Sequence, residues 1–211
     1  MESKKSKSNN GDLVSIVLTN YNKKKFIGEL LDSLIGQTCK SWELVIMDDC
    51  STDGSVEVIQ NFVDNNKDKK IIFVRNEKNI GLIKNFEKGL QFASGGYIAV
   101  CDSDDVWLPG KLEKELQLLK RGNFGMVYSD LAVVDENLKL IKKSFRKSYL
   151  SFFSNPKDDS FDELIDDNHI TAPTILFKAG LKRKLVPFSK YVMQDYWIAI
   201  IFSIFSSIGY L

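Results

Sequence analysis

The chain has 211 residues, 44% hydrophobic and 27% charged, which is enough apolar material for one globular domain with a core. Its 29 Lys and Arg residues nearly balance its 28 Asp and Glu residues, so no broad basic field exists that would attract nucleic acid. The three cysteines, Cys39, Cys50 and Cys101, lack metal-binding spacing and predict free thiols in a reducing compartment.

Residues 1–12 are rich in Lys, Ser and Asn, and they predict a disordered leader without a signal peptide. From there to residue 130, short β-branched runs alternate with longer amphipathic runs that carry an apolar stripe. This alternation predicts an α/β fold with a mostly parallel sheet and helices on both faces. The expected strands are residues 13–18, 42–47, 71–74, 97–101 and 126–128.

Beyond the fifth expected strand the pattern changes. Residues 131–141 predict a small hairpin, and residues 144–170, which lack a clear period, predict a mobile loop. The apolar stretch 198–211 is shorter than the roughly 20 residues of a spanning helix. It predicts a core helix that runs into a strand, with a membrane-associated segment as the alternative. We expect one domain with a nucleotide-binding half, 13–130, and an acceptor-binding half, 131–211.

Polar residues follow three of the expected strands. Thr19 and Tyr21 follow the first strand, and Asp48 and Asp49 end the second. The run 102–105 ends the fourth. In an open α/β sheet, ligands bind at the carboxyl ends of the strands. We therefore expect these side chains to converge on one site, with Asp48 supporting the turn; the structural alternative is three separate caps or turns.

The run Asp102-Ser103-Asp104 is the sharpest of these signals. Two carboxylates two residues apart would repel each other at neutral pH unless a cation lay between them. Oxygen ligands suit Mg²⁺ or Mn²⁺, which proteins bind through one or two carboxylates together with substrate phosphates. Such a metal neutralises a diphosphate leaving group. The alternative is that Asp104 or Asp105 only caps the next turn.

Together, the motifs resemble family 2 glycosyltransferases with the GT-A fold. Residues 14–22 resemble the first strand and turn of that family, and residues 33–55 resemble its next signature. Residues 95–112 are similar to its metal-site strand almost throughout. The resemblance covers about residues 13–130 strongly and continues more weakly to the end. It implies a Rossmann-like sheet, a small acceptor-side subregion at the C-terminal end, and a chain truncated before the segment that closes over the diphosphate.

The resemblance implies a role for each residue at the strand ends. Thr19, Tyr21 and Asp49 would hold the nucleoside, with Tyr21 against the face of the base and Asp49 accepting its ring N–H. Asp104 would bind the metal, Mn²⁺ or Mg²⁺. Asp102 would contact the ribose or phosphate and share in the metal site. The alternative for Tyr21 is an ordinary core aromatic.

The chain departs from the family at one position. Many members carry an Arg-Asn pair in the helix after the third strand, whereas Phe86 and Glu87 stand there in this chain. Lys84 or Asn85 would face the phosphates instead. The alternative is that both are ordinary solvent-facing helix residues.

An inverting transfer needs a carboxylate that takes the proton of the acceptor hydroxyl opposite the leaving group. Met193-Gln-Asp-Tyr-Trp197 resembles the acidic motif that opens the family's acceptor-side helix. Asp195 is therefore the candidate base, and Trp197 is a candidate acceptor contact. The alternative for Asp195 is a helix N-terminal carboxylate favoured by the helix dipole. His169, the single histidine, is a second candidate acceptor contact, with a structural role as the alternative.

The resemblance thus predicts a metal-assisted, inverting hexosyltransferase that uses a UDP- or dTDP-sugar and a saccharide or lipid-linked acceptor. Its expected setting is bacterial surface-polysaccharide synthesis in the cytoplasm, with peripheral association at the inner face of the membrane. Two alternatives stand beside it. Asp102, Asp104 and Val106 fit the pattern of haloacid-dehalogenase-type phosphatases, whose nucleophile normally ends the first strand. A non-catalytic nucleotide-binding module is the other.

Overall fold

The computed structural model describes residues 10–150, 161–166 and 168–211. The strands are β1 Val14–Asn20, β2 Trp42–Asp48, β3 Ile71–Arg75, β4 Tyr97–Asp102, β5 Met126–Tyr128, β6 Val133–Val134, β7 Leu140–Lys142, β8 Ile175–Lys178 and β9 Ile208–Tyr210. The helices are α1 Lys24–Ile35, α2 Ser55–Asn65, α3 Leu82–Phe92, α4 Lys111–Arg121, α5 Phe145–Leu150, α6 Phe161–Asp166, α7 Lys182–Leu185 and α8 Gln194–Phe205.

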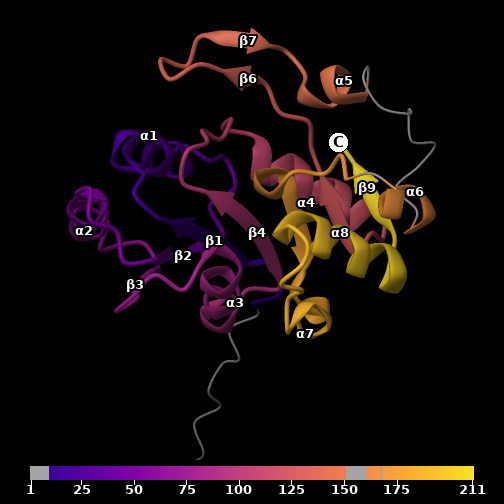
Figure 1. Cartoon of the computed structure of the whole chain (residues 1–211), viewed down its shortest axis with the longest axis horizontal. Coiled ribbons are helices and arrows are strands. Elements are labelled where there is room, and N and C mark those ends of the chain that lie inside the picture. Colours follow the sequence, from indigo (N-terminus) through magenta and orange to yellow (C-terminus); the bar gives the residue numbers. More distant parts are fainter. Residues whose placement is uncertain (1–9, 151–160, 167) are drawn as a thin grey trace, which may run out of the picture.

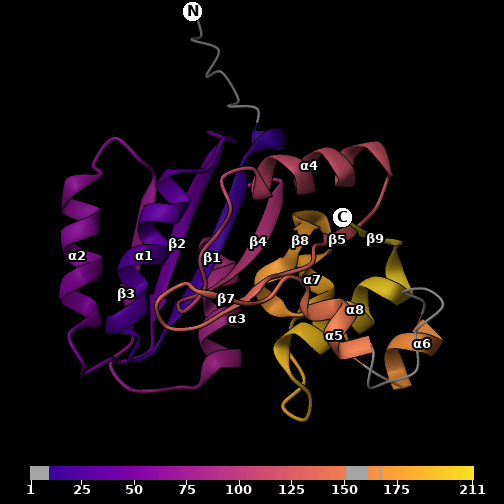
Figure 2. The ribbon, with the colours of Figure 1, turned by 90° about the horizontal axis from the view of Figure 1, so that it is seen from above.

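A seven-stranded sheet in the order β3-β2-β1-β4-β8-β5-β9 forms the centre of the molecule (Figures 1 and 2). The first four strands along the chain pair with one another in parallel. β8 runs antiparallel between β4 and β5, and β9 is parallel to β5. The predicted α/β fold with a mostly parallel sheet is confirmed. Both halves of the chain contribute strands to this one sheet.

Neighbouring residues of β1 pack into different cores on the two faces of the sheet, because side chains alternate along a strand. Ile16 lies in the core beneath α1, α2 and α4, whereas Val17 lies in the core beneath α3 and α8. Every residue of β1 is buried, which explains its nearly continuous apolar sequence. α3 approaches the sheet most closely at Gly89, where an added Cβ would lie 2.8 Å from Cγ1 of Val17.

The C-terminal half matches part of the expectation. The hairpin β6–β7 and the sequence of α8 followed by β9 are confirmed. The prediction of a loop over residues 144–170 is wrong for the part that the structure describes, because the helices α5 and α6 lie within this range. Residues 151–160 and 167 of the range lie outside the described residues. α6 buries Leu164 in the core beneath α8, and such a short helix leaves too few turns to show a period.

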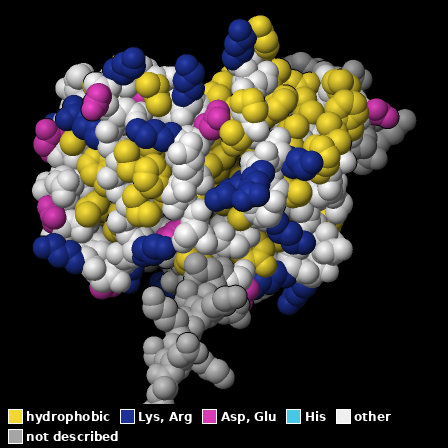
Figure 3. Space-filling model, turned by 90° about the horizontal axis from the view of Figure 1, so that it is seen from below, with side chains coloured by type: hydrophobic (Ala, Val, Ile, Leu, Met, Phe, Trp, Pro, Cys, Tyr) yellow, Lys and Arg dark blue, Asp and Glu magenta, His cyan; other side chains and the backbone are white. Residues whose placement is uncertain are grey.

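The side chains on the face opposite the hairpin are mixed in character. Hydrophobic side chains gather toward the side where α8 lies, and Lys and Arg side chains lie beside them (Figure 3). Ile204 and Phe205 of α8 are 52% and 49% exposed. Among the described residues, no helix combines the length and the apolarity that a membrane crossing requires. All three cysteines are free, as expected, and Cys101 is buried.

Candidate functional site

The carboxyl ends of β1, β2 and β4 lie side by side in the sheet. Thr19 pairs with Asp102 across β1 and β4, and Asn20 pairs with Asp48 across β1 and β2. A cavity of about 440 Å³ opens at this edge. Its lining includes Thr19, Tyr21, Asp49, Asp102 and Asp104, so the structure brings the expected nucleotide and metal residues together.

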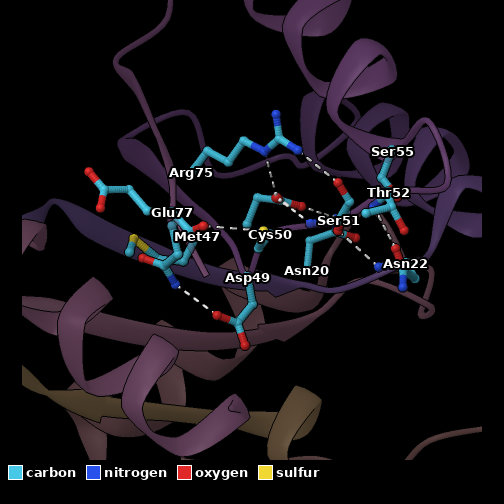
Figure 4. Close-up of polar contacts among 12 residues, drawn as sticks. Asn20, Asn22, Met47, Asp49, Cys50, Ser51, Thr52, Ser55, Arg75 and Glu77 are labelled. Atoms are coloured by element: carbon cyan, nitrogen blue, oxygen red, sulfur yellow. Dashed lines mark hydrogen bonds and ion pairs between the residues drawn. The ribbon is translucent and has the colours of Figure 1, made fainter. Parts of the chain in front are cut away.

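Asp49 is a buried carboxylate held by three donors. Oδ1 accepts hydrogen bonds from Nδ2 of Asn76 and from the backbone N–H of Ile80, both at 2.9 Å. Oδ2 accepts from the backbone N–H of Gly81 at 2.8 Å. Gly81 has a φ of 84°, which a residue with a side chain rarely adopts. These contacts fix the carboxylate at the wall of the cavity. Figure 4 shows Asp49 with one of these hydrogen bonds as a dashed line.

Asp48 belongs to the turn after β2. Its carboxylate accepts hydrogen bonds from Nδ2 of Asn20 at 2.8 Å and from the backbone N–H of Ser51 at 2.9 Å. Nε of Arg75 lies 3.8 Å from Oδ1, and the guanidinium also donates to the carbonyl of Ser51 (Figure 4). Since Asp48 is fully buried by these partners, it supports the turn, as expected.

Tyr21 is 48% exposed and lines the cavity, so the alternative of a core aromatic is wrong. Thr19, two residues earlier, is 6% exposed and lies in the buried strand β1. The aromatic ring is therefore available to a ligand, whereas the threonine presents only a small part of its surface.

Three carboxylates lie within four residues at the end of β4, and burial together with neighbouring negative charge raises the pKa of two of them. Burial is the largest cause that raises the pKa of Asp102 to about 7, and the charges of Asp105, Asp104 and Asp195 raise it further. Burial and the charge of Asp104 raise the pKa of Asp105 to about 6. α4 begins only at Lys111 and has no side-chain cap, so Asp105 does not cap that helix. The site thus concentrates negative charge that a cation would relieve.

A cationic group already lies beside Asp104. Nζ of Lys23 is 2.6 Å from Oδ2 of Asp104, and both side chains line the cavity. In the described residues, no group of three or more His, Cys, Asp or Glu side chains forms a complete metal site. This donor set fits Mg²⁺ or Mn²⁺, because such ions take one or two carboxylates and complete their shell with water and substrate phosphates.

Asp195, at the start of α8, lies close enough to Asp102 to act on it electrostatically. Its Oδ1 accepts hydrogen bonds from the backbone N–H of Tyr196 at 2.7 Å and from Nδ2 of Asn168 at 3.3 Å. Burial raises its pKa above the ordinary value of 3.8. Its charge in turn helps to raise the pKa of Asp102. Asp195, at the start of α8, therefore acts on Asp102, at the end of β4, although the two residues are distant in the sequence.

Four expected site residues are not among the residues that line the cavity: Lys84, His169, Trp197 and the candidate base, Asp195. Lys84 is exposed on α3, and the next residue, Asn85, lines the cavity in its place. Successive helix residues point about 100° apart, so only one of the two can face inward. His169 is 3% exposed and packs beside Tyr128, with ring centroids 6.1 Å apart. Nε1 of Trp197 donates to the carbonyl of Leu185 at 2.8 Å, so its ring belongs to the packing beneath α8.

Two residues near the cavity were missed as functional candidates. Lys23 gave no signal, because it stands within a run of three lysines and its partner Asp104 is 81 residues away. Asn76 joins Asp49 to Asn85 by donating to one carboxylate oxygen and to Oδ1 of the other asparagine. Its place directly after β3, at the same edge as the other strand ends, was the available signal.

A second cavity, of about 740 Å³, lies between the start of α4 and the β6–β7 hairpin. Asp104 and Asp105 form part of its wall, so it adjoins the first cavity at the carboxylates. Apolar side chains such as Leu131 and Val134 line another part, and Pro173 lies near the segment that contacts Asp195.

Residues 15–186, most of the chain, match the family described as Glycosyl transferase family 2. The chain belongs to this family. The match places Asp102-Ser103-Asp104 in a glycosyltransferase sequence and not in a haloacid-dehalogenase-type phosphatase. As a family 2 member, the chain spans 63% and 61% of the length of two curated relatives that it matches.

Comparison with individual family members and solved structures supports the same fold. The Escherichia coli protein named UDP-Glc:alpha-D-GlcNAc-diphosphoundecaprenol beta-1,3-glucosyltransferase WfgD is 28% identical over 193 residues, which are 90% of this chain and 70% of that protein. S. aureus TarS 1-349 in complex with UDP-GlcNAc superposes with a TM-score of 0.73 at 21% identity, covering 94% of this chain and 55% of TarS. The mannosyltransferase PcManGT from Pyrobaculum calidifontis, in complex with GDP-Man and Mn²⁺, gives a TM-score of 0.72 at 18% identity, covering 94% of this chain and 54% of that one. The expected GT-A fold is confirmed.

Proposed function

We propose that this family 2 chain moves a sugar from a UDP- or dTDP-activated donor to a saccharide or lipid-linked acceptor, with inversion at the anomeric carbon. The observation that carries the proposal is the effect of Asp195, at the start of α8, on Asp102, at the end of β4: the charge of Asp195 helps to raise the pKa of Asp102. A carboxylate within electrostatic range of the β4 end supports the two-sided arrangement that a single displacement requires.

The nucleoside would lie against β1 and β2. Tyr21 offers an exposed aromatic face for the base, and Asp49 offers a carboxylate oxygen for its ring N–H. Uracil and thymine both carry this N–H, whereas cytosine has an unprotonated nitrogen there. The three donors that hold Asp49 orient the carboxylate before a ligand arrives, which lowers the cost of binding.

The diphosphate would lie near the β4 carboxylates. Asp104, with Asp102 beside it, would hold Mn²⁺ or Mg²⁺, and the metal would neutralise the charge that develops on the diphosphate as it leaves. PcManGT was solved with GDP-Man and Mn²⁺, which supports a divalent ion at this position. Lys23 would contribute a second positive charge at the same place.

Asp195 would act as the base. It takes the proton from the acceptor hydroxyl while the acceptor oxygen bonds to the anomeric carbon, and the bond from that carbon to the diphosphate oxygen breaks. The nucleoside diphosphate leaves with the electron pair. Burial raises the pKa of Asp195, and a base with a higher pKa accepts a proton more readily at neutral pH.

The acceptor would occupy the larger cavity, which adjoins the carboxylates and has apolar walls. WfgD, by its name, acts on a diphosphoundecaprenol-linked sugar, which supports a lipid-linked acceptor here. We place this reaction in bacterial surface-polysaccharide synthesis at the cytoplasmic face of the membrane. Contacts of His169 and Trp197 with the acceptor remain predictions, although neither side chain lines the larger cavity.

Calorimetric titration of UDP, dTDP and CDP, each with and without Mn²⁺, tests the proposal. We expect UDP and dTDP to bind in the presence of Mn²⁺, and CDP to bind more weakly. Absence of binding by all three nucleotides would contradict a donor site. Binding of UDP without turnover of any UDP-sugar would instead favour the non-catalytic module.

A further inference from the structure

The hairpin formed by β6 and β7 stands outside the main sheet, at the periphery of the molecule (Figure 1). Every residue from 136 to 143 is exposed. Leu138, Leu140 and Ile141 are 47%, 50% and 60% exposed. A two-stranded hairpin is marginally stable by itself in water, and apolar side chains at its tip do not stabilise it unless they are covered.

Basic side chains surround this apolar tip. Residues 139–147 contain five of them, and four are exposed lysines: Lys139, Lys142, Lys143 and Lys147. The two acidic residues of the hairpin are already engaged. Asp135 accepts hydrogen bonds from the backbone N–H groups of Asn137 and Lys139, and Glu136 forms an ion pair with Lys25. The free charge of the tip is therefore positive.

The backbone conformation at the tip of the hairpin does not explain why a leucine stands at position 138. Leu138 has a φ of 59°, in the left-handed region that favours glycine or asparagine. A leucine at this position adds backbone strain, and its side chain is half exposed instead of filling a core. Glycine would suit the turn better than leucine. The leucine side chain forms part of the wall of the larger cavity, and about half of its surface stays exposed.

The base of the hairpin is fixed to the body. The backbone N–H of Phe145 donates to the carbonyl of Leu131 at 2.8 Å, and that of Arg146 donates to Oδ1 of Asp130 at 3.0 Å. The guanidinium of Arg146 lies 4.4 Å from the ring centroid of Tyr210 in β9. The tip is thus presented from an anchored base, with the larger cavity beside it.

We propose that this hairpin docks on the surface of a lipid bilayer that contains anionic lipids. Leu138, Leu140 and Ile141 enter the headgroup region, and the exposed lysines lie at the level of the lipid phosphates. Apolar side chains flanked by lysines are the combination that binds such surfaces, because burial and charge attraction add. That the docked hairpin brings a lipid-linked acceptor to the larger cavity rests on the proposed function; the docking itself does not.

Co-sedimentation with vesicles tests the inference. The probes are vesicles of phosphatidylcholine, alone or mixed with phosphatidylglycerol, at low and high salt. We expect the whole chain to sediment with the mixed vesicles at low salt and much less with phosphatidylcholine alone or at high salt. Lys142→Gln with Lys143→Gln should weaken partitioning about 25-fold, since one lysine contributes about fivefold. The matched control, Lys67→Gln with Lys78→Gln, removes two exposed lysines elsewhere and should change little.

Leu138→Gly separates docking from folding. It removes the apolar side chain and relieves the backbone, so we expect an equal or higher thermal midpoint together with at least tenfold weaker partitioning, roughly the effect of losing one buried leucine side chain. Ile204→Ser, on α8, is the control for the other exposed apolar face. Partitioning that is unchanged in Leu138→Gly, or lost in Ile204→Ser instead, would overturn the proposal.

Two other outcomes also contradict lipid docking. Wild-type protein that ignores the mixed vesicles but binds a soluble polyanion such as dextran sulfate would identify a polyanion partner. A concentration-dependent dimer that Leu138→Gly abolishes would identify a second copy of the chain. UDP binding measured on the same preparations keeps the two proposals distinguishable, because the smaller cavity does not include the hairpin.

Discussion

Nζ of Lys23 lies 2.6 Å from Oδ2 of Asp104, the carboxylate proposed to hold the metal. The two residues come from the turn after β1 and the turn after β4, which the parallel pairing of these strands brings together. The ammonium group of Lys23 thus occupies a position that would attract a divalent cation, and a metal must compete with it for Asp104.

Lys23→Gln is therefore expected to tighten the binding of Mn²⁺ when no nucleotide is present. The side chains are 39% and 43% exposed, so the gain should be small, up to about fivefold, as for other exposed ion pairs. Calorimetric titration of Mn²⁺ measures it. Lys69→Gln, which breaks the remote pair of Lys69 with Asp68, is the control. Unchanged or weaker Mn²⁺ binding by Lys23→Gln would show that the pair does not compete with the metal.

Asp49→Asn should weaken UDP binding by roughly 10- to 100-fold, the range expected for hydrogen bonds to a charged group. The new amide also places a donor near backbone N–H groups that now donate to the carboxylate. The decisive readout is discrimination: wild-type protein should prefer UDP over CDP, and the variant should lose this preference. Asp64→Asn, at an exposed position on α2, is the control. A variant that keeps the preference for UDP would exclude Asp49 from base recognition.

We expect Glu43 to make the free energy of unfolding depend on pH in the acidic range. Burial by itself would raise the pKa of this carboxyl, but hydrogen bonds from Lys70, Ser15 and Ser94 outweigh burial and lower the pKa to about 2. Because the folded pKa lies below the ordinary value of 4.5, the stabilisation is complete above about pH 4.5 and is lost as the pH falls toward 2.

The shift corresponds to a contribution of about 3 kcal/mol to the free energy of unfolding at neutral pH, as an order of magnitude. Glu43→Gln should lose this contribution at pH 7 and show a flatter dependence on pH below 4.5. Urea unfolding across the acid range measures both effects. Glu57→Gln, at an exposed position on α2, should behave as wild type. Equal slopes for Glu43→Gln and wild type would contradict the low pKa.

A pair of glycine substitutions tests the packing of the helices on the sheet. Gly89→Ala should destabilise the protein by about 1–2 kcal/mol, because its Cβ would lie 2.8 Å from Val17 Cγ1 and 2.9 Å from Met47 Cγ. Gly28→Ala in α1 meets only Val58 Cγ1 at 4.0 Å and should stabilise by about 0.5–1 kcal/mol. Thermal unfolding compares the two, and the same sign for both would contradict the close approach of α3.

The strand ends could be predicted from the sequence because the fold places them by a general rule. β1, β2 and β4 are short apolar runs followed by polar residues, and the carboxyl ends of parallel strands meet at one edge. Asp49 and Tyr21 were found in this way.

Contacts between distant segments could not be predicted, because no local pattern encodes them. The insertion of β8 antiparallel between β4 and β5 depends on pairing across about 80 residues of chain. The preference for Asn85 over Lys84 depends on the rotation of α3 about its axis, which the sequence period leaves uncertain by one residue.

In the proposed mechanism, Asp195 is the base of an inverting transfer. The most direct measurement compares Asp195→Asn with wild type and with Asp162→Asn, an exposed control on α6, in Mn²⁺-dependent release of UDP from a panel of UDP-sugars, with water as acceptor. We expect unchanged UDP binding, release lowered about 10²- to 10⁴-fold in Asp195→Asn only, and an inverted anomer in the wild-type product. Release by Asp195→Asn within about tenfold of wild type, or a retained anomer, would contradict this mechanism.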